Sequence, residues 1–508
     1  MLPIASLIRR SARRHGRRTA VLDGDRSLSF REVDERSDRL AHALTGLSPV
    51  AGSRVALVMP NRLEHVEVDF AVIKAGKVKV PVNTRLRPDE RRHLIEDSGA
   101  DVLVFDGTEE DWAADLADEL PHLRLVRVGS GTLGLDHDDL RAQAGPGPAA
   151  VARRPEDPSL ILYTSGTTGR PKGATWSNAG RLAATIAMLT DEIDPRPGDA
   201  MAHVGSMAHG SGSKVLAHFV RGSRTVPVAR FDPERFLDLV AEHRATHTFL
   251  VPTMVAMLVD AAAGGRDPGT LRQITYGGAP TTPAALDRAL AVLGDRLVQV
   301  YGSCEAPHPV LVLDADDHRD EAARRSSGRE TTTVETRLVL DGRDVADGEA
   351  GELWVRGPAV MLGYWGRPDA DAEVFVDGWY RTGDVAVRDD RGYLTIVDRL
   401  RDLVISGGYN VYPAEVEAAL ADHPDLAEVC VIGIPDDRWG EAVTAVVVPR
   451  PGATVTPDDV RRHCEGRLAG YKKPRVVEVV DELPKGSTGK VLKRELRDRR
   501  WTGSGRRV

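Results

Sequence analysis

The central segment of the chain reads Tyr163-Thr164-Ser165-Gly166-Thr167-Thr168-Gly169-Arg170-Pro171-Lys172-Gly173. Glycines let the backbone turn and bring its N–H groups close to an anion, while the hydroxyls and Lys172 add donors and positive charge. The apolar run 159–163 has strand character, so the loop would start from the edge of a sheet. We therefore predict a phosphate-binding loop. It is not a Walker A loop, because no Gly-Lys-Ser/Thr ends it.

Composition places the chain among large globular proteins. Its 508 residues are too many for one ordinary core and predict at least two domains. A net charge of -8 argues against a general nucleic-acid binder, which would show a basic face. Neither a signal peptide nor an apolar run long enough to span a membrane is expected. Three cysteines without metal-ligand spacing, Cys304, Cys430 and Cys464, favour a reducing cytoplasm.

Apolar strands and helical segments alternate along most of the chain. A strand at 55–59, a helical stretch and a strand at 78–81 form one such unit, and further strands are expected at 101–105, 248–251, 271–276 and 297–300. This alternation predicts layered α/β architecture with largely parallel sheets. After Glu349, short strands at 351–355 and 393–397 predict a small β subdomain.

The last hundred residues form a separate pattern. Helices are expected at 413–421, 457–468 and 492–500, and strands at 426–434 and 442–448. These elements predict a compact α+β unit, and the tail 501–508 is expected to be disordered.

Further motifs follow the loop in a fixed order. They are Tyr276-Gly277-Gly278-Ala279-Pro280, Tyr301-Gly302-Ser303-Cys304-Glu305, Tyr380-Arg381-Thr382-Gly383-Asp384, Asp398-Arg399-Leu400-Arg401-Asp402, Ser406-Gly407-Gly408-Tyr409-Asn410 and Gly486-Ser487-Thr488-Gly489-Lys490. In this order the motifs resemble those of the adenylate-forming superfamily, which contains acyl-CoA synthetases, luciferases and peptide-synthetase adenylation domains. The resemblance spans nearly the whole chain.

The resemblance implies a domain organisation. Residues 1–398 would form the N-terminal adenylation domain, 399–402 the hinge and 403–508 a small mobile C-terminal lid domain. Arg401 would absorb the backbone change when the lid rotates between two half-reactions. Whether the chain is a monomer or a homodimer stays open.

The resemblance also implies an ATP site that uses Mg²⁺. Glu305 would bind the metal, Tyr301 would lie against adenine, Asp384 would accept the ribose hydroxyls and Arg399 would bond ribose or phosphate. Lys172, His209 and Lys490 would be catalytic, with Lys490 stabilising the α-phosphate transition state. The full set of nucleotide-binding residues would be Thr164, Ser165, Gly166, Thr167, Thr168, Gly169, Lys172, Gly277, Gly278, Ala279, Tyr301, Gly302, Ser303, Cys304, Asp384, Arg399 and Lys490.

For the second half-reaction the resemblance implies CoA as co-substrate. The loop containing Gly407, Gly408 and Tyr409 would face the acyl-adenylate after rotation, with Gly408 leaving room for the pantetheine thiol.

The chain departs from the family pattern around the acid. Cys304 replaces the usual threonine, and a thiol is a poorer donor than a hydroxyl. The substrate pocket would contain His209, Ser211, Ser213, Lys214, Gly278 and Cys304. Two orientations of Lys214 stay open: toward solvent, or inward, where its charge needs an anionic partner. We expect a small polar, aromatic or dicarboxylic acid rather than a long fatty acid.

Four functions are compatible with these residues. The leading hypothesis is an ATP-dependent carboxylate–CoA ligase that works through acyl-AMP. A second is a diazotase that activates nitrite for diazo formation on an arylamine. A third is an acyl-AMP ligase that loads a carrier protein, and a fourth is a non-catalytic nucleotide-binding relative.

Overall fold

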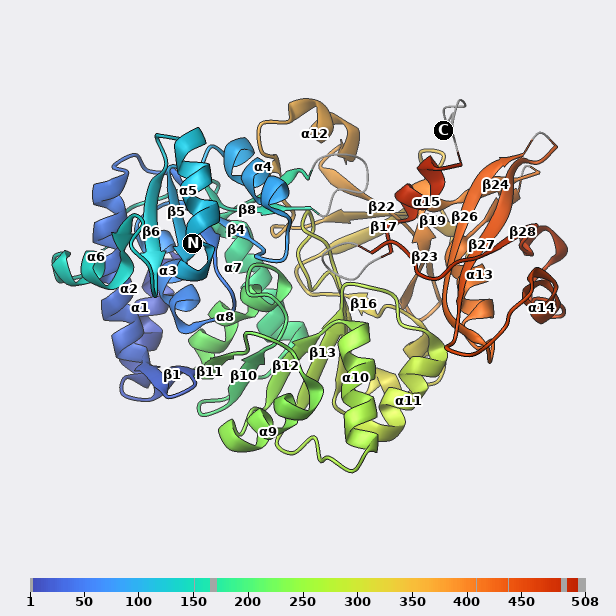
Figure 1. Cartoon of the computed structure of the whole chain (residues 1–508), viewed down its shortest axis with the longest axis horizontal. Helices are drawn as coiled ribbons and strands as arrows, with labels where there is room; N and C mark the ends of the chain where they lie inside the picture. Colours follow the sequence, from blue (N-terminus) through green and yellow to red (C-terminus); the bar gives the residue numbers. More distant parts are fainter. Residues whose placement is uncertain are drawn as a thin grey trace.

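The computed structural model describes residues 3–149, 151–164, 171–407, 409–436, 438–485 and 491–500. These residues form four sheets with helices packed around them, as expected for layered α/β architecture. In Figure 1 the orange and red C-terminal unit lies at one end of the molecule, beside the β subdomain. In the described part of the chain, no helix combines the length and apolar character that crossing a membrane requires.

The first sheet has eight strands, and its neighbouring strands β8 and β9 come directly before and after the predicted phosphate loop. Strands β3, β4, β5 and β6 are parallel, and β8 is parallel to β4. These strands are almost continuously apolar because both faces of the sheet are covered. The strands are β3 (Arg54–Val58), β4 (Val78–Val82), β5 (Val102–Asp106), β6 (Arg124–Val128), β7 (Leu135–Asp136), β8 (Pro158–Tyr163), β9 (Gly173–Ser177) and β20 (Gly363–Tyr364), with helices α4 (Pro88–Ser98) and α5 (Glu110–Glu119).

The second sheet has nine strands, and the N-terminal hairpin forms one of its edges. Val21 of β1 pairs in parallel with Thr225 of β11, a long-range contact that the sequence pattern did not predict. The strands are β1 (Thr19–Asp23), β2 (Arg26–Ser29), β10 (Ala200–His203), β11 (Arg224–Pro227), β12 (His247–Leu250), β13 (Gln273–Gly277), β14 (Leu297–Tyr301), β15 (Leu311–Leu313) and β16 (Arg329–Glu330). The helices that follow its strands or flank it are α7 (Asn178–Ala187), α8 (Gly210–Arg221), α9 (Pro233–His243), α10 (Pro252–Ala263) and α11 (Pro283–Leu293).

The third sheet is the expected β subdomain. Its six strands pair antiparallel, and β22 and β23 bring Asp384 opposite Arg399. The strands are β17 (Glu335–Leu340), β18 (Arg343–Asp344), β19 (Ala350–Arg356), β21 (Phe375–Val376), β22 (Trp379–Arg388) and β23 (Leu394–Arg399), and helix α12 (Pro368–Val374) lies beside them.

The fourth sheet belongs to the C-terminal unit. Strands β26 and β27 form its long central hairpin. Helix α14 ends at His463 rather than at residue 468, because the chain turns at Gly466, whose φ is +73°. The elements are β24 (Val404–Ser406), β25 (Tyr409–Val411), β26 (Leu426–Asp436), β27 (Gly440–Pro449), β28 (Val476–Val479), α13 (Pro413–Leu420), α14 (Pro457–His463) and α15 (Lys493–Asp498).

Helix α3 (Leu63–Lys74) connects the two large sheets. All of its residues are buried, because one apolar face packs with α1 (Ile4–His15) and α8 and another packs against the eight-stranded sheet. α2 (Phe30–Leu47), which begins with a capping box at Ser29 and Glu32, lies along it.

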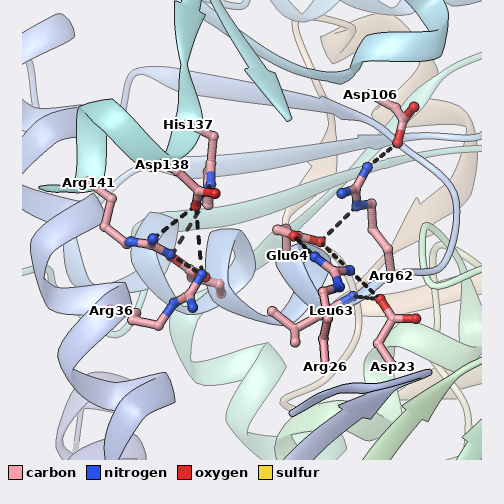
Figure 2. Close-up of polar contacts among 11 residues, drawn as sticks. Asp23, Arg26, Arg36, Arg62, Leu63, Glu64, Asp106, His137, Asp138 and Arg141 are labelled. Carbon is pink, nitrogen blue, oxygen red and sulfur yellow. Dashed lines mark hydrogen bonds and ion pairs between the residues drawn. The ribbon is translucent and has the colours of Figure 1, made fainter. Parts of the chain in front are cut away.

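Buried acidic side chains of α3 are held by arginines from distant segments (Figure 2). Glu67 is fully buried and accepts hydrogen bonds from Arg36 at 2.9 Å and from Arg141 of α6 (His137–Gln143) at 3.1 Å. Glu64 accepts from Arg26 at 2.5 Å and from Arg62 at 2.7 Å. Burial alone would raise the pKa of Glu64, but these hydrogen bonds outweigh it and lower the pKa to about 2.

Candidate active site

A cavity of about 1140 Å³ is lined by residues of the predicted motifs at 163–173, 276–280, 301–305, 380–384 and 398–402. Its walls come from both large sheets, from α7 and α8, from the β subdomain and from residues 399–401. Among the described residues, none beyond Arg401 lines the cavity.

The ends of the predicted phosphate loop are held together at the cavity edge. Thr164 N–H donates to the Lys172 carbonyl at 3.0 Å, continuing the antiparallel pairing of β8 with β9. The ammonium of Lys172 lies 5.0 Å from the ring centre of Tyr364. Residues 165–170, including Ser165, Gly166, Thr167, Thr168 and Gly169, lie outside the described residues.

Glu305 lines the cavity close to Lys172. The Tyr364 hydroxyl donates to its Oε1 at 2.9 Å, and burial together with this carboxylate raises the pKa of Tyr364. Among the described residues no cluster of three or more metal-ligating side chains is present. A single carboxylate fits Mg²⁺, which commonly takes one or two protein carboxylates and completes its shell with phosphates and water.

Asp384 and Arg399 form a second polar group in the cavity wall. Tyr301, which we expected against adenine, contacts Asp384 but is not among the residues that line the cavity. The Tyr301 hydroxyl donates to Asp384 Oδ2 at 2.6 Å, and Arg399 Nε lies 3.2 Å from Asp384 Oδ1. Burial, with the Asp384 carboxylate adding to it, raises the pKa of Tyr301. The arrangement holds the Asp384 carboxylate at the cavity surface, where it can accept hydrogen bonds from hydroxyl groups.

Backbone forms the wall between these groups. Gly277, Gly278 and Ala279 follow β13, and Gly302 and Ser303 follow β14. A Cβ at Gly277 would lie 2.3 Å from the Val300 carbonyl oxygen, and one at Gly302 would lie 2.5 Å from the His308 nitrogen. Both positions therefore require glycine.

Cys304 lines the cavity and also packs with the apolar core of the β subdomain. Its Sγ lies 3.8 Å from the Tyr163 carbonyl oxygen, and its own carbonyl accepts from Trp176 Nε1 at 2.7 Å. The thiol thus contributes a small apolar surface and a weak hydrogen bond.

His209 stands at the start of α8 and faces the cavity with Ser213. Burial lowers the pKa of His209, so its ring is neutral near pH 7. The Ser213 hydroxyl donates to the Gly210 carbonyl at 2.7 Å and lies 3.3 Å from His308 Nε2. A Cβ at Gly212 would lie 1.9 Å from the Met207 carbonyl oxygen, so the helix can begin here only with glycine.

Ser211 and Lys214 require a correction. We expected both in the substrate pocket, but neither is among the residues that line the described cavity, and both are buried. Ser211 Oγ lies 3.0 Å from His203 Nδ1. The Lys214 ammonium pairs with the buried carboxylate of Glu192, in the π-helical turn after α7, and lies 5.2 Å from the ring centre of Phe249. Its anionic partner is therefore part of the protein.

The structure adds charged cavity residues that sequence reasoning missed, and besides Glu352, Glu373 and Arg381 they include three that lie close together. These three are Asp69 from α3, Lys79 from β4 and Arg181 from α7. The signal for Lys79 was present in the sequence, since it is the charged residue in the apolar strand Val78-Lys79-Val80-Pro81-Val82.

The predicted CoA-facing and hinge residues lie on the side of the C-terminal unit. Gly407, at φ +61°, packs against Trp439, and Tyr409 is exposed with its ring centre 4.8 Å from that of Tyr471. Arg401 lines the cavity, and its carbonyl accepts from Arg497 of α15 at 3.0 Å. Gly408 and Lys490 lie outside the described residues.

Fold and site together define an adenylate-forming enzyme. The family described as AMP-binding enzyme matches residues 8–365, and the AMP-binding enzyme C-terminal domain matches residues 415–490. The chain belongs to this family, which confirms the superfamily and fold expected from the sequence.

Individual relatives cover nearly the whole chain. A feruloyl-CoA synthase from an Amycolatopsis species is 39% identical over 96% of this chain and 97% of its own. The fatty acid–[acyl-carrier-protein] ligase ScoC from Streptomyces coeruleorubidus is 36% identical over 96% and 95%. The structure of the amide bond synthetase McbA from Marinactinospora thermotolerans has a TM-score of 0.89 at 30% identity, covering 98% of this chain and 100% of its own.

Proposed function

We propose that the chain is an ATP-dependent ligase that activates a carboxylic acid as acyl-AMP and then transfers the acyl group to CoA. One observation carries this proposal: a nucleotide-binding set of side chains and a separate, largely apolar compartment line the same cavity. The proposed nucleotide set is Lys172, Glu305, Asp384 and Arg399, which line the cavity, together with Tyr301, which donates a hydrogen bond to Asp384. The compartment, which we call the acid compartment, is formed by residues of α3, β4, β8, β9, α7 and α8.

In the first half-reaction a carboxylate oxygen of the acid attacks the α-phosphorus of ATP, and pyrophosphate leaves. Charge accumulates on both phosphate groups, so positive groups and hydrogen-bond donors must surround them. We assign the β- and γ-phosphates to the loop ending at Lys172, the ribose to Asp384 and the α-phosphate to Lys490. Glu305 would hold Mg²⁺, which neutralises phosphate charge when bound.

In the second half-reaction the CoA sulfur attacks the acyl carbon, the thiol proton is lost and AMP leaves. We assign the Gly407–Tyr409 loop to this step, after rotation about Arg401. The neutral ring of His209 lies beside the acid compartment, where it adds a polar edge without a charge.

The relatives support acid activation, and their names include two acceptors, CoA and an acyl-carrier protein, and an amide bond synthetase. The nitrite alternative depended on Lys214 as an anion-binding group in the pocket. Because Lys214 pairs with Glu192, the geometry gives that alternative no support.

The proposal is tested by measuring pyrophosphate release from ATP and Mg²⁺ with a panel of carboxylic acids. Active acids are then incubated with CoA, with a phosphopantetheinylated carrier protein or with an amine, and products are identified by mass. We expect acid-dependent pyrophosphate release and an acyl-CoA product. Acyl transfer to the carrier protein or amine but not to CoA would contradict the proposed acceptor. Pyrophosphate release with nitrite alone would contradict the proposed substrate class.

A further inference from the structure

The acid compartment contains a buried group of three charged side chains, which we call the distal cluster: Asp69, Lys79 and Arg181. Lys79 Nζ lies 3.2 Å from Asp69 Oδ1, and Arg181 Nη2 lies 3.1 Å from the same oxygen. Their side chains are 6%, 5% and 10% exposed, respectively, and all three line the cavity.

The distal cluster has more positive than negative charge. Burial alone would raise the pKa of Asp69, but Lys79 and Arg181 outweigh it and lower the pKa to about 2, so Asp69 is ionised. The neighbouring His65 is neutral, because burial and the charge of Lys79 lower its pKa to about 3. Burial lowers the pKa of Lys79 and Asp69 opposes this shift, so two basic side chains face one carboxylate.

A purely structural ion pair would not need the second cation. Removing a charge from water is costly unless an opposite charge compensates it. Among the described residues, Asp69 is the partner that the Lys79 ammonium contacts, and an ammonium has three N–H donors. The ammonium therefore retains donor capacity beside the cavity.

The surroundings indicate what kind of ligand fits. In β4, Val78, Val80 and Val82 pack in the core, whereas Lys79 and Pro81 face the cavity. Lys79 lies opposite Leu160 of β8, which in turn pairs with Trp176 of β9, and both of these side chains line the cavity. The middle of a bound acid would thus contact apolar side chains.

The length of the compartment follows from the strand register. Leu160 precedes Tyr163, the last residue of β8, by three positions, which corresponds to about 10 Å of strand. The phosphate loop begins directly after Tyr163. Arg181, Ala184 and Thr185 of α7 follow helical spacing and line the same cavity, as does Met188 directly after the helix. A compartment about 10 Å long suits a compact acid, such as one built on a single ring.

We propose that the distal cluster binds a second acidic oxygen group, a carboxylate or phenolic oxygen, at the far end of the acid that is adenylated. The acid would carry one carboxylate at the nucleotide, an apolar middle along Leu160 and Trp176, and the second group at Lys79 and Arg181. This inference rests on the proposed function and specifies the substrate class of the same site.

The test compares matched acids on the wild-type enzyme and on variants. Benzoic and cinnamic acids with a para carboxylate or hydroxyl are each compared with the para-methyl counterpart, by kcat/KM for pyrophosphate release. We expect wild type to prefer the acidic member at least about tenfold, as for a hydrogen bond to a charged group. Lys79→Met should abolish this preference while retaining activity on the para-methyl acids.

Lys74→Met is the matched control. Lys74 is also a buried lysine paired with aspartates, Asp34 at 2.6 Å and Asp38 at 3.0 Å, but it does not line the cavity. This variant should keep the wild-type preference. If Lys79→Met fails to fold, Arg181→Gln provides the same comparison.

Two results would overturn the inference. One is that the wild-type enzyme shows no preference for the acidic member of each pair. The other is an equal loss of kcat/KM on all acids in the distal-cluster variants, which would indicate a structural role. Calorimetry of terephthalate binding without ATP distinguishes failure of this inference from failure of the proposed function. Suppose that terephthalate binds to the wild-type enzyme, that Lys79→Met abolishes this binding, and that no acid gives pyrophosphate release. This result would support the distal cluster and contradict the ligase activity. Pyrophosphate release with nitrite alone would contradict both.

Discussion

The hydroxyl of Tyr301 donates a 2.6 Å hydrogen bond to Asp384, so two motifs 83 residues apart are joined where Asp384 lines the cavity. Arg399 approaches the other carboxylate oxygen from β23. The three side chains come from the second sheet and from two strands of the β subdomain. The nucleotide site therefore depends on how these sheets pack against each other.

Tyr301→Phe tests this relationship, because it removes the donor and retains the ring. We expect ATP affinity, measured by calorimetry, to fall about tenfold, since a hydrogen bond to a charged group contributes about 1.5–3 kcal/mol. Tyr393→Phe is the matched control: Tyr393 donates to Asp317 at 2.6 Å, away from the cavity. Unchanged affinity in Tyr301→Phe, or equal weakening in the control, would contradict the assignment.

Lys490→Ala should nearly abolish acyl-AMP formation from acid and ATP while leaving thioester formation from preformed acyl-AMP largely intact. The reason is that the proposed role of Lys490 is confined to the α-phosphate in the first half-reaction. The two steps are measured separately, by pyrophosphate release and by acyl-CoA production. Lys485→Ala, which removes a half-exposed lysine paired with Glu428, should retain both steps. Equal loss of both half-reactions in Lys490→Ala would refute the role.

Lys214→Leu should destabilise the protein by about 3–5 kcal/mol, because it leaves the Glu192 carboxylate buried without its partner. The free energy of unfolding is measured by urea denaturation, and the preference among acids should stay as in wild type. The double variant Lys214→Leu with Glu192→Leu should recover much of the lost stability, since no charge is then uncompensated. A changed acid preference at unaltered stability would show that Lys214 acts on the substrate.

The hydrogen bonds to Glu64 predict a pH-dependent contribution to stability. Because folding lowers its pKa from 4.5 to about 2, the contribution is present above pH 4.5 and is lost as the pH falls toward 2. Glu64→Gln should cost about 3 kcal/mol at pH 7, and its difference from wild type should shrink below pH 4.5. Urea denaturation between pH 7 and pH 3 checks this. Glu335→Gln, at an exposed pair with Arg356, should cost little at any pH, and a pH-independent loss in Glu64→Gln would contradict the prediction.

Much of the fold could be predicted from local patterns. The strand–helix–strand unit at β3, α3 and β4, the parallel strands β12 to β14 and the central hairpin of the C-terminal unit were all expected from apolar periodicity. Apolar periodicity did not predict that β1 pairs with β11, because a local pattern does not indicate which distant strand will be the partner. It likewise did not predict that the Asp398 carboxylate accepts the Ala414 N–H of α13 at 2.8 Å.

The sequence by itself determined the family and the order of the nucleotide motifs, because loops that contact phosphate and ribose need particular residue types at fixed spacing. Tertiary structure decided which buried lysine faces the cavity. Lys214 and Lys79 both stand in apolar surroundings, and periodicity assigns each to a face of its helix or strand. Which face meets the cavity depends on partners from other segments: Glu192 compensates Lys214, whereas Asp69 and Arg181 meet Lys79 beside the acid compartment.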